Sequence, residues 1–359
     1  MNYDSLEITY VLPPPNHQDP QVLIMASAYM LLFLLGTCGN VTVLTTIYHV
    51  SRLHRARLDN TLLYVIVLSC VDFGVCISLP FTVLDQILGF WMFGSVICKL
   101  QALLENFGKI LSSLIITAMS FDRYAGVCQA QNKCLRSKKM TASILLGLAA
   151  YALITLGPLL WSFNTKEIIL FEKKTAPHKL TRMQIEKCTM VNVSSSVFTM
   201  FTVYQFILCY CLPLSLVAFF YIKLLHCLRE HKRQFKSSHI PLLRISLYTF
   251  ALACFYFICW TPFWISTLYA IYLEYADENG KTVSPAFVYS MYFIHALPFT
   301  NSAINWILYG LFSCNLKALK FNIDKNYENH INGNTKILAK INESQICEDH
   351  DDNRQILRI

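Results

Sequence analysis

The 359-residue chain has few charged side chains: Asp, Glu, Lys and Arg make up only 14% of it. A soluble globular protein carries about 25%. Hydrophobic residues make up 55% of the chain. This composition excludes an ordinary soluble domain and favours an integral membrane protein. The formal net charge of +8 does not indicate nucleic-acid binding. The basic residues lie in short loops between apolar runs, where membrane topology accounts for them.

Other features are missing as well. The first twenty or so residues are polar, with three prolines at 13–15, and lack the basic region and apolar core of a cleavable signal peptide. The fourteen cysteines are dispersed, mostly within apolar runs, and no Cys/His spacing matches a zinc site. The chain has no His-Glu-x-x-His motif and no pair of catalytic aspartates in its apolar runs, so we expect no enzyme. No internal repeat is visible, which weighs against a transporter, the first rival class.

Apolar runs are what the chain does contain. A bilayer core of about 30 Å needs about 20 apolar helical residues. A spanning segment must satisfy its own backbone hydrogen bonds, so each run is expected to be a helix. There are seven such runs, at about 22–49, 60–86, 96–126, 140–162, 196–227, 241–272 and 285–311. The predicted fold is therefore all-α, a seven-transmembrane-helix bundle, with a short cytoplasmic amphipathic helix after it at about 313–321.

Loop charges predict the orientation of the bundle. The first, third and fifth loops carry clusters of Arg and Lys, whereas the N-terminal segment carries Asp4, Glu7 and Asp19 and no basic residue. By the positive-inside rule the N-terminus lies outside. The fourth loop, at about 163–195, disagrees because it also holds several lysines. We give it less weight because it is long and late in the chain.

These boundaries divide the chain into three parts. Residues 1–21 form an extracellular segment and residues 22–321 form the seven-helix domain. Residues 322–359 form a polar cytoplasmic tail that is expected to be disordered.

Polar residues inside the spans are candidates for function, because burying them in lipid is expensive. Asp72 lies in the middle of the second span, and Ser112, Asn301, Ser302 and Asn305 lie in the third and seventh. Together they can form a hydrated cluster that holds a cation. The alternative is that they only join the helices by hydrogen bonds.

Glu105 and Lys109 lie four residues apart in the third span and therefore share one helix face. Two interpretations stay open. The residues neutralise each other as a structural ion pair, or they line a wet cavity and contact a charged ligand. Both require that this face points into the bundle and not at lipid.

Residues at the two ends of the third span form further candidates. Asp122, Arg123 and Tyr124 lie at the cytoplasmic border, where an acid beside the arginine allows an ion pair that acts as a releasable latch. An arginine there can also merely reach the headgroups. Cys98 at the outer end and Cys188 in the fourth loop both face the oxidising side, so we expect a disulfide between them. Asn192 begins Asn-Val-Ser in the same loop and is a glycosylation candidate.

Together these positions resemble the rhodopsin-like (class A) G-protein-coupled receptors. The resembling motifs are Gly39-Asn40 with Val43, Leu68 with Asp72, Trp91-x-Phe93-Gly94 with Cys98, Asp122-Arg123-Tyr124, Pro213 with Tyr221, and Cys259-Trp260-Thr261-Pro262. The seventh span is similar to the somatostatin, opioid and allatostatin-C type of peptide receptor. It carries Asn301-Ser302, Asn305 and Leu308-Tyr309-Gly310, followed by Asn315-Leu316-Lys317. Several motifs in order, each on the right span, are far more specific than any one alone.

The resemblance implies a plasma-membrane receptor for a neuropeptide agonist. It also implies coupling to a heterotrimeric G protein, of the inhibitory class by the narrower likeness, and arrestin as a further partner. No prosthetic cofactor is implied. The ligand would contact Glu105, Lys109, Trp260 and His295. A sodium ion would be held by Asp72, Ser112, Asn301 and Asn305. The cytoplasmic opening would involve Asp122, Arg123, Tyr124, Tyr221 and Tyr309.

One departure from the family pattern bears on signalling. The usual Asn-Pro-x-x-Tyr of the seventh span reads Asn305-Trp306-x-x-Tyr309, so a bulky aromatic replaces the kink-forming proline. This favours an alternative in which a divergent receptor binds a ligand or partner but signals weakly. Ser113 and Tyr256 also replace the usual apolar members of the packing switch beside the fifth-span proline.

Overall fold

The computed structural model describes residues 7–11, 20–54, 60–129, 137–176, 179–230, 240–276, 287, 290–291 and 293–310. The chain divides into two units, Met1–Leu308 and Tyr309–Ile359. In the second unit Tyr309 and Gly310 are described, and both are helical. The predicted amphipathic helix at 313–321 and the tail at 322–359 lie outside the described residues.

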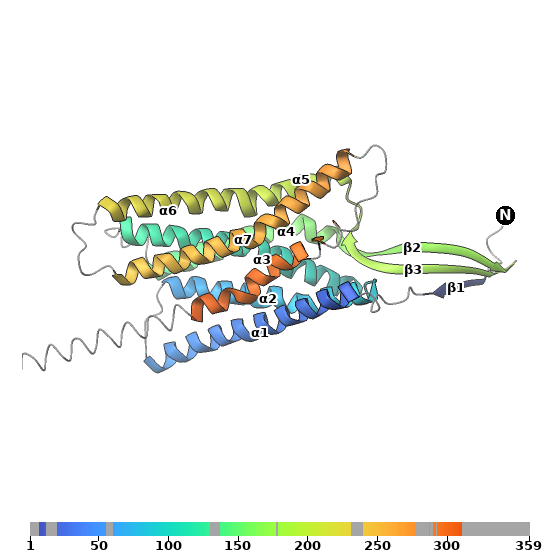
Figure 1. Ribbon diagram of the computed structural model, residues 1–359, viewed down its shortest axis with the longest axis horizontal. Coiled ribbons are helices and arrows are strands. Elements are labelled where there is room, and N and C mark those ends of the chain that lie inside the picture. Colours follow the sequence, from blue (N-terminus) through green and yellow to red (C-terminus); the bar gives the residue numbers. More distant parts are fainter. Residues whose placement is uncertain are drawn as a thin grey trace, which may run out of the picture. The chain divides into compact units, whose positions relative to one another are not determined.

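The first unit is built mainly from long helices (Figure 1). They are α1 (Pro20–His54), α2 (Asn60–Leu88), α3 (Gly94–Cys128), α4 (Lys138–Ser162), α5 (Ser195–Phe206), α6 (Leu212–Glu230) and α7 (Ile240–Ala276). A short π-helix, η2 (Ile207–Cys211), joins α5 to α6, and the three together form the fifth predicted span. α7 is therefore the sixth span, and residues 293–310 form the described helix of the seventh.

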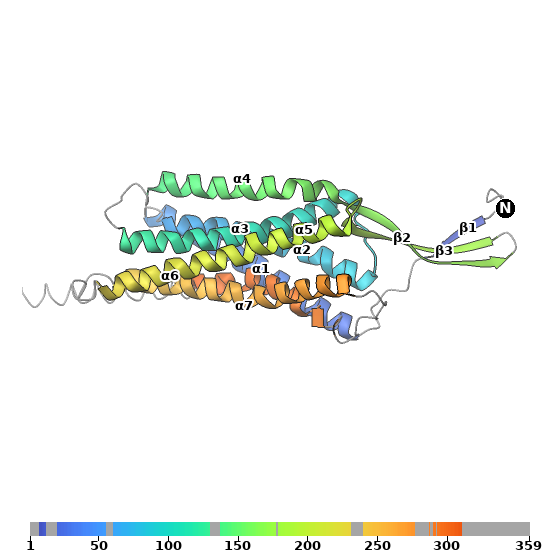
Figure 2. The same cartoon turned by 90° about the horizontal axis from the view of Figure 1, so that it is seen from above.

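This arrangement confirms the predicted seven-helix bundle. Six helical stretches in the described part of the chain are long and apolar enough to cross a membrane, and each lies on a predicted run. α3 is the central element, since it packs against α2, α4, α6 and α7 (Figures 1 and 2). It therefore brings its polar residues into contact with most of the bundle.

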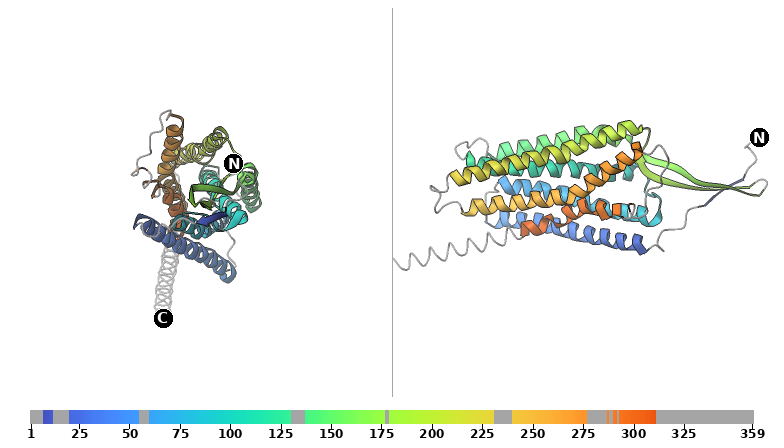
Figure 3. Two further views of the ribbon diagram at one scale, coloured as in Figure 1. Left: turned by 90° about the vertical axis from the view of Figure 1, so that its right-hand side faces the viewer. Right: turned by 45° about the horizontal axis from the view of Figure 1, so that its top comes forward.

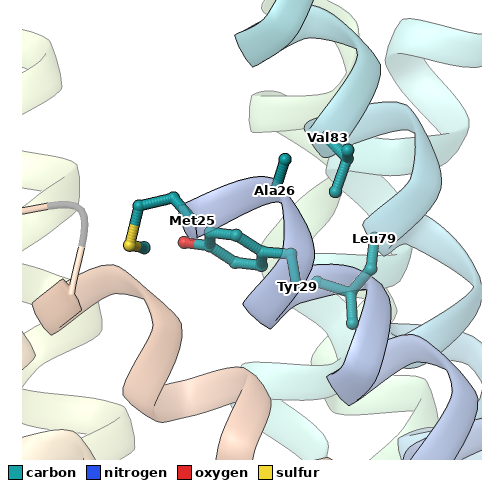
Figure 4. Close-up of a cluster of buried hydrophobic side chains, with 5 residues drawn as sticks. All are labelled: Met25, Ala26, Tyr29, Leu79 and Val83. Atoms are coloured by element: carbon teal, nitrogen blue, oxygen red, sulfur yellow. The ribbon is translucent and has the colours of Figure 1, made fainter. Parts of the chain in front are cut away.

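Helices within the bundle associate through close van der Waals packing and not through the hydrophobic effect, because lipid tails are as apolar as leucine. Near the extracellular end, Met25, Ala26 and Tyr29 of α1 meet Leu79 and Val83 of α2 in a buried cluster (Figure 4). The Tyr29 ring also meets Phe299 edge to face, with ring centroids 5.8 Å apart. The cluster thus joins α1 and α2 to the helix of residues 293–310.

The outward faces of the helices are apolar and open. On α4, the side chains of Leu146 and Ile154 are 74% and 75% exposed. Exposed aliphatic residues on a helix with these lengths and neighbours face lipid, which agrees with a multi-pass membrane protein.

A three-stranded sheet lies at one end of the bundle, and the sequence did not predict it (Figures 1 and 3). β2 (Phe163–Ala176) and β3 (Lys179–Met190) form an antiparallel hairpin, and β1 (Glu7–Val11) pairs in parallel with β3. The strand order is β1-β3-β2. The hairpin follows the end of α4 and precedes α5, so it forms the fourth loop of the membrane topology.

Three links tie the hairpin to the outer ends of α2 and α3. Cys188 of β3 forms a disulfide with Cys98 of α3, with Cα atoms 5.5 Å apart, which confirms the predicted pairing. Lys187 Nζ lies 3.2 Å from Asp85 Oδ1 of α2. The backbone N–H of Trp91 donates to Glu186 O at 2.8 Å. The disulfide places this loop on the oxidising side, so its lysines do not overturn the predicted orientation.

The π-helix η2 lies just before Pro213 of α6. Proline has no N–H, so it cannot donate to the carbonyl four residues earlier, which is that of Cys209. The Tyr256 hydroxyl of α7 donates to Cys209 O instead, at 3.1 Å. Tyr256 is fully buried, so this bond joins the fifth and sixth spans in the middle of the bundle.

Candidate functional site

A cavity of about 460 Å³ lies among α1, α2, α3, α7 and the helix of residues 293–310. It extends from Gln86, two residues before the end of α2, to Ser112 deep in α3. All four residues predicted to contact a ligand line it: Glu105, Lys109, Trp260 and His295. The sequence therefore identified walls of one cavity from residues that lie on three different helices.

Glu105 is held against the α2 side of the cavity. Its Oε1 accepts hydrogen bonds from Gln101 Nε2 at 3.1 Å, Thr82 Oγ1 at 3.3 Å and Ser78 Oγ at 3.4 Å. Gln101 Nε2 also lies 2.9 Å from Thr82 Oγ1. Three donors on one oxygen fix the carboxylate and stabilise its charge.

Lys109 points to the opposite side, towards α7. Its Nζ lies 5.1 Å from the ring centroid of Phe263, 5.6 Å from that of Trp264 and 5.9 Å from that of Trp260. Cation–π attraction to a desolvated site contributes about 2 kcal/mol. Burying an ion costs several kcal/mol.

The structure shows whether Glu105 and Lys109 form an ion pair with each other. Within the described residues, the ion pairs closer than 4.0 Å do not include Glu105 with Lys109. The residues share a helix face, but their charged groups turn to different walls. The cavity therefore has an acidic side at α2 and a basic, aromatic side at α7.

Trp260 connects this cavity to the middle of the bundle. Its ring centroid is 5.3 Å from Phe263 and 5.6 Å from Tyr256, the residue that bonds to the fifth span. The His295 ring lies 5.1 Å from Phe263, edge to face. A group that moves Phe263 or Trp260 therefore presses on Tyr256, whose hydroxyl donates directly to Cys209 O of the π-helix.

Below the cavity lies the predicted polar cluster. Asp72 is fully buried, and its Oδ2 accepts from Asn305 Nδ2 at 2.8 Å. Ser112 and Asn301 line the cavity, so the cluster borders it. Buried oxygens without a hydrogen-bond partner among the described residues remain on Asp72 (Oδ1), Ser112, Asn301 and Asn305. Four such oxygens, one of them on a carboxyl group, are of the kind that binds a hard cation.

At the cytoplasmic end of α3, Arg123 is turned inward. It pairs with Asp122 and donates to Thr61 Oγ1 of α2 at 2.5 Å. Both members of the pair are about 95% buried, so Arg123 does not reach out to the headgroups; its action as a releasable latch stays a prediction. Tyr124 stacks on Phe220 of α6, with ring centroids 5.9 Å apart.

Tyr221 and Tyr309 were predicted to act at the same end. The Tyr221 hydroxyl of α6 lies 2.7 Å from Thr249 Oγ1 of α7. Tyr309 falls in the second unit, so its place relative to these residues is not described. Asn192 lies between β3 and α5 with φ of 60°. Its side chain is exposed, which a glycosylation acceptor requires. Its modification stays a prediction.

The structure also shows what sequence reasoning missed. Ser78 and Thr82 lie one helical turn apart on the α2 face that meets Glu105, a spacing that the sequence displays openly. Trp264 lies one turn from Trp260, and that spacing gives the lysine its second indole ring. Two patterns in the sequence could have predicted these contacts. They are the polar pair Ser78 and Thr82 and the aromatic pair Trp260 and Trp264, each with a spacing of four residues.

Trp306, the residue in place of the helix-seven proline, packs on Gly39 of α1. A Cβ at residue 39 would lie 2.1 Å from Trp306 Cδ1 and 2.3 Å from Cγ. The indole therefore occupies the space that only a glycine leaves open.

Comparison with known proteins agrees with this geometry. The chain is 72% identical over 300 residues to a probable G-protein-coupled receptor of Caenorhabditis elegans, covering 84% of this chain and 68% of that protein. It is 40% identical over 328 residues to neuropeptide receptor 18 of the same organism, covering 86% and 68%. It is 25% identical over 299 residues to somatostatin receptor type 1 of Rattus norvegicus, covering 82% and 70%. Residues 39–309 match the family described as 7 transmembrane receptor (rhodopsin family).

That match covers most of the chain and all seven spans in part, and the family is one of receptors. With the bundle, the disulfide-tied hairpin and the multi-pass topology, the conclusion is direct. This chain belongs to the rhodopsin family of seven-transmembrane receptors, the class A G-protein-coupled receptors, at the plasma membrane.

Proposed function

We propose that this chain is a receptor for an extracellular neuropeptide and passes agonist binding to a heterotrimeric G protein. The cavity with charged walls below the hairpin is the observation that carries the proposal. A peptide presents charged ends and apolar side chains, which such a cavity complements. The names of two relatives, neuropeptide receptor 18 and somatostatin receptor type 1, support the peptide class.

The proposed mechanism is a shift between two arrangements of the bundle. A ligand changes that equilibrium only by binding one arrangement better than the other. The closed arrangement holds Arg123 against Asp122 and Thr61. A ligand that displaces Phe263 and Trp260 would disturb the Tyr256 bond to the fifth span, and so favour an arrangement in which Arg123 is released.

The experiment is to express the chain in cells and measure G-protein activation against a neuropeptide panel. Arg123→Ala is the control, because it removes the arginine at the cytoplasmic end, about three helical turns along α3 from Ser112 at the nearest part of the cavity. We expect a peptide response that the variant loses while its surface expression persists. Agonist-driven signalling that is unchanged in Arg123→Ala would reject the proposed role of this residue.

The inhibitory G-protein class and arrestin binding are finer proposals from the likeness to somatostatin and opioid receptors. Suppression of stimulated cyclic AMP by the active peptide tests the first. Agonist-dependent recruitment of labelled arrestin tests the second. A response only through calcium release would reject the inhibitory class.

We also propose that Asp72, Ser112, Asn301 and Asn305 hold a sodium ion, which supplies positive charge to the buried carboxylate. The four buried oxygens without partners support this proposal. The test compares the thermal stability of purified receptor in sodium and in N-methylglucamine chloride. We expect sodium to stabilise the wild type and not Asp72→Asn. Equal sodium effects on both proteins would reject the site.

A second candidate function is favoured by Trp306. Its indole fills the contact with Gly39 where a kinked helix would bend. A receptor locked in this way binds ligand but signals weakly. Silence across the panel, with good surface expression and with signalling restored by Trp306→Pro, would support this alternative over the first.

A further inference from the structure

The basic side of the cavity indicates which chemical group the ligand carries. We propose that Lys109 binds a carboxylate, so that the ligand group reaching the cavity floor is a free acid beside an aromatic side chain. This inference deepens the proposed function and rests on it.

The first observation is that no carboxylate among the described residues lies within ion-pair distance of Lys109. Among the residues that the structure describes, its Nζ takes part in no hydrogen bond and no ion pair within 4.0 Å. Its Nζ lies over the faces of Trp260, Phe263 and Trp264. An ammonium group has three donors and no acceptor, so aromatic faces alone leave its hydrogen bonds unmade.

The second observation is a surplus of donors on the same side. Trp260 lines the cavity, and its indole N–H is buried without an acceptor within the described part of the chain. A buried donor without an acceptor is costly, so a group in the cavity that accepts hydrogen bonds from both Lys109 Nζ and the Trp260 indole N–H would satisfy this wall. A carboxylate supplies two oxygens and the compensating charge.

The acid already in the cavity does not fill this role. Glu105 is bound to Ser78, Thr82 and Gln101 on the other wall. Turning it to Lys109 would break those hydrogen bonds and leave their donors unpaired. Lys109 therefore remains available to an incoming anion.

The rings around Lys109 indicate what accompanies the carboxylate. Phe263 and His295 lie edge to face in the cavity wall, and Trp260 lies beside Phe263. Aromatic side chains favour another aromatic group placed edge to face or offset. A peptide whose last residue is aromatic, with its C-terminal carboxyl group free, matches both features. An amidated peptide offers the ring without the charge.

The first experiment synthesises every peptide of the panel in two forms, free acid and C-terminal amide, and measures activation by each. For the active peptide we expect the acid to be at least about 30-fold more potent, as for a buried charge pair that loses one partner. Lys109→Gln should reduce this ratio to near one, and Lys109→Arg should keep it above one. Lys99→Met is the matched control, since Lys99 is an exposed lysine of the same helix.

The second experiment does not depend on signalling. Purified wild-type receptor is heated with N-acetyltryptophan or N-acetyltryptophanamide, a pair that differs only in the carboxylate. A probe of this size with ordinary ligand efficiency has a Kd of about 0.1 mM. We expect the acid at about 1 mM to raise the melting temperature of wild type and Lys99→Met, with no effect of the amide.

The outcomes separate the two proposals. Acid-selective stabilisation without any peptide response would leave the carboxylate site standing and reject the neuropeptide function. Peptide activation that is equally potent for acid and amide, or no stabilisation by the acid probe, would overturn the role given to Lys109. A loss of potency that is equal for both forms in Lys109→Gln would show a structural lysine, and would also overturn it.

Discussion

The contact between Gly39 and Trp306 yields the sharpest stability prediction. In Gly39→Ala the new Cβ would lie 2.1 Å from Cδ1, 2.2 Å from Nε1 and 2.3 Å from Cγ of the indole. Those atoms belong to a rigid ring close to its attachment point, so they cannot move aside without moving helix or rotamer. Overpacking of this kind costs about 1–3 kcal/mol.

The assay is a double-mutant cycle on purified receptor, read as the melting temperature. The melting-temperature shift per kcal/mol falls as the chain lengthens, from roughly 2–4 °C at 150–250 residues to about 1.3 °C for 359 residues. We therefore expect Gly39→Ala to lower the melting temperature by about 1–4 °C. In the Trp306→Ala background the same change should cost nothing, because the obstructing ring is gone. Coupled residues in contact show interaction energies of about 0.5–3 kcal/mol.

Gly147→Ala on α4 is the matched control. A Cβ at residue 147 meets nothing within 4 Å, so this change adds only helix propensity and should be neutral or stabilising. If Gly39→Ala is tolerated as well as the control, or costs the same with and without the indole, the packing argument is wrong.

Three further predictions follow from single contacts. Tyr256→Phe removes the donor to Cys209 O and should cost about 1 kcal/mol, measured as a lower melting temperature, and should raise ligand-free signalling. Asp85→Asn breaks the partly exposed pair with Lys187 and should cost less than about 1 kcal/mol, with surface expression unchanged, because the disulfide still holds the hairpin. Asn192→Gln should remove one glycan, seen as a single downward shift on a gel that glycosidase treatment abolishes.

Most helices of the bundle could be predicted because a helix that crosses the lipid needs a continuous run of about 20 apolar residues. Runs such as 60–86 and 140–162 need only length and apolar composition to be recognised, and α2 and α4 match them to within a few residues. The same rule identified Asp72 and Glu105, since an ionisable residue in such a run stands out.

The hairpin was missed because strand pairing is a relation between distant segments. β2 contains an uninterrupted apolar stretch at 168–171 that no alternation marks as a half-buried strand. β1 pairs with β3 across more than 160 intervening residues, which local patterns do not reveal. The lysines of this loop, taken alone, indicate the cytoplasmic side of the membrane, whereas the disulfide between Cys98 and Cys188 places the loop outside.

The directions of Glu105 and Lys109 could not be predicted for a related reason. Their spacing fixes a shared helix face, yet the partner of each depends on which helix packs beside that face. α2 offers hydroxyl groups to the glutamate, and α7 offers rings to the lysine. Only the packed bundle distinguishes a closed ion pair from two charges turned apart.

The parallel pairing of β1 with β3 has a practical consequence for labelling this receptor. Glu7 to Val11 hydrogen-bond to Lys179 to Met183, and β3 is covalently joined to α3 through Cys188. A fluorophore placed on Tyr10, whose side chain is 62% exposed, would therefore report on the hairpin and not on a free terminus. With a second dye at the exposed N-terminal end of α5, energy transfer between the two dyes would measure how far the hairpin moves when a ligand binds.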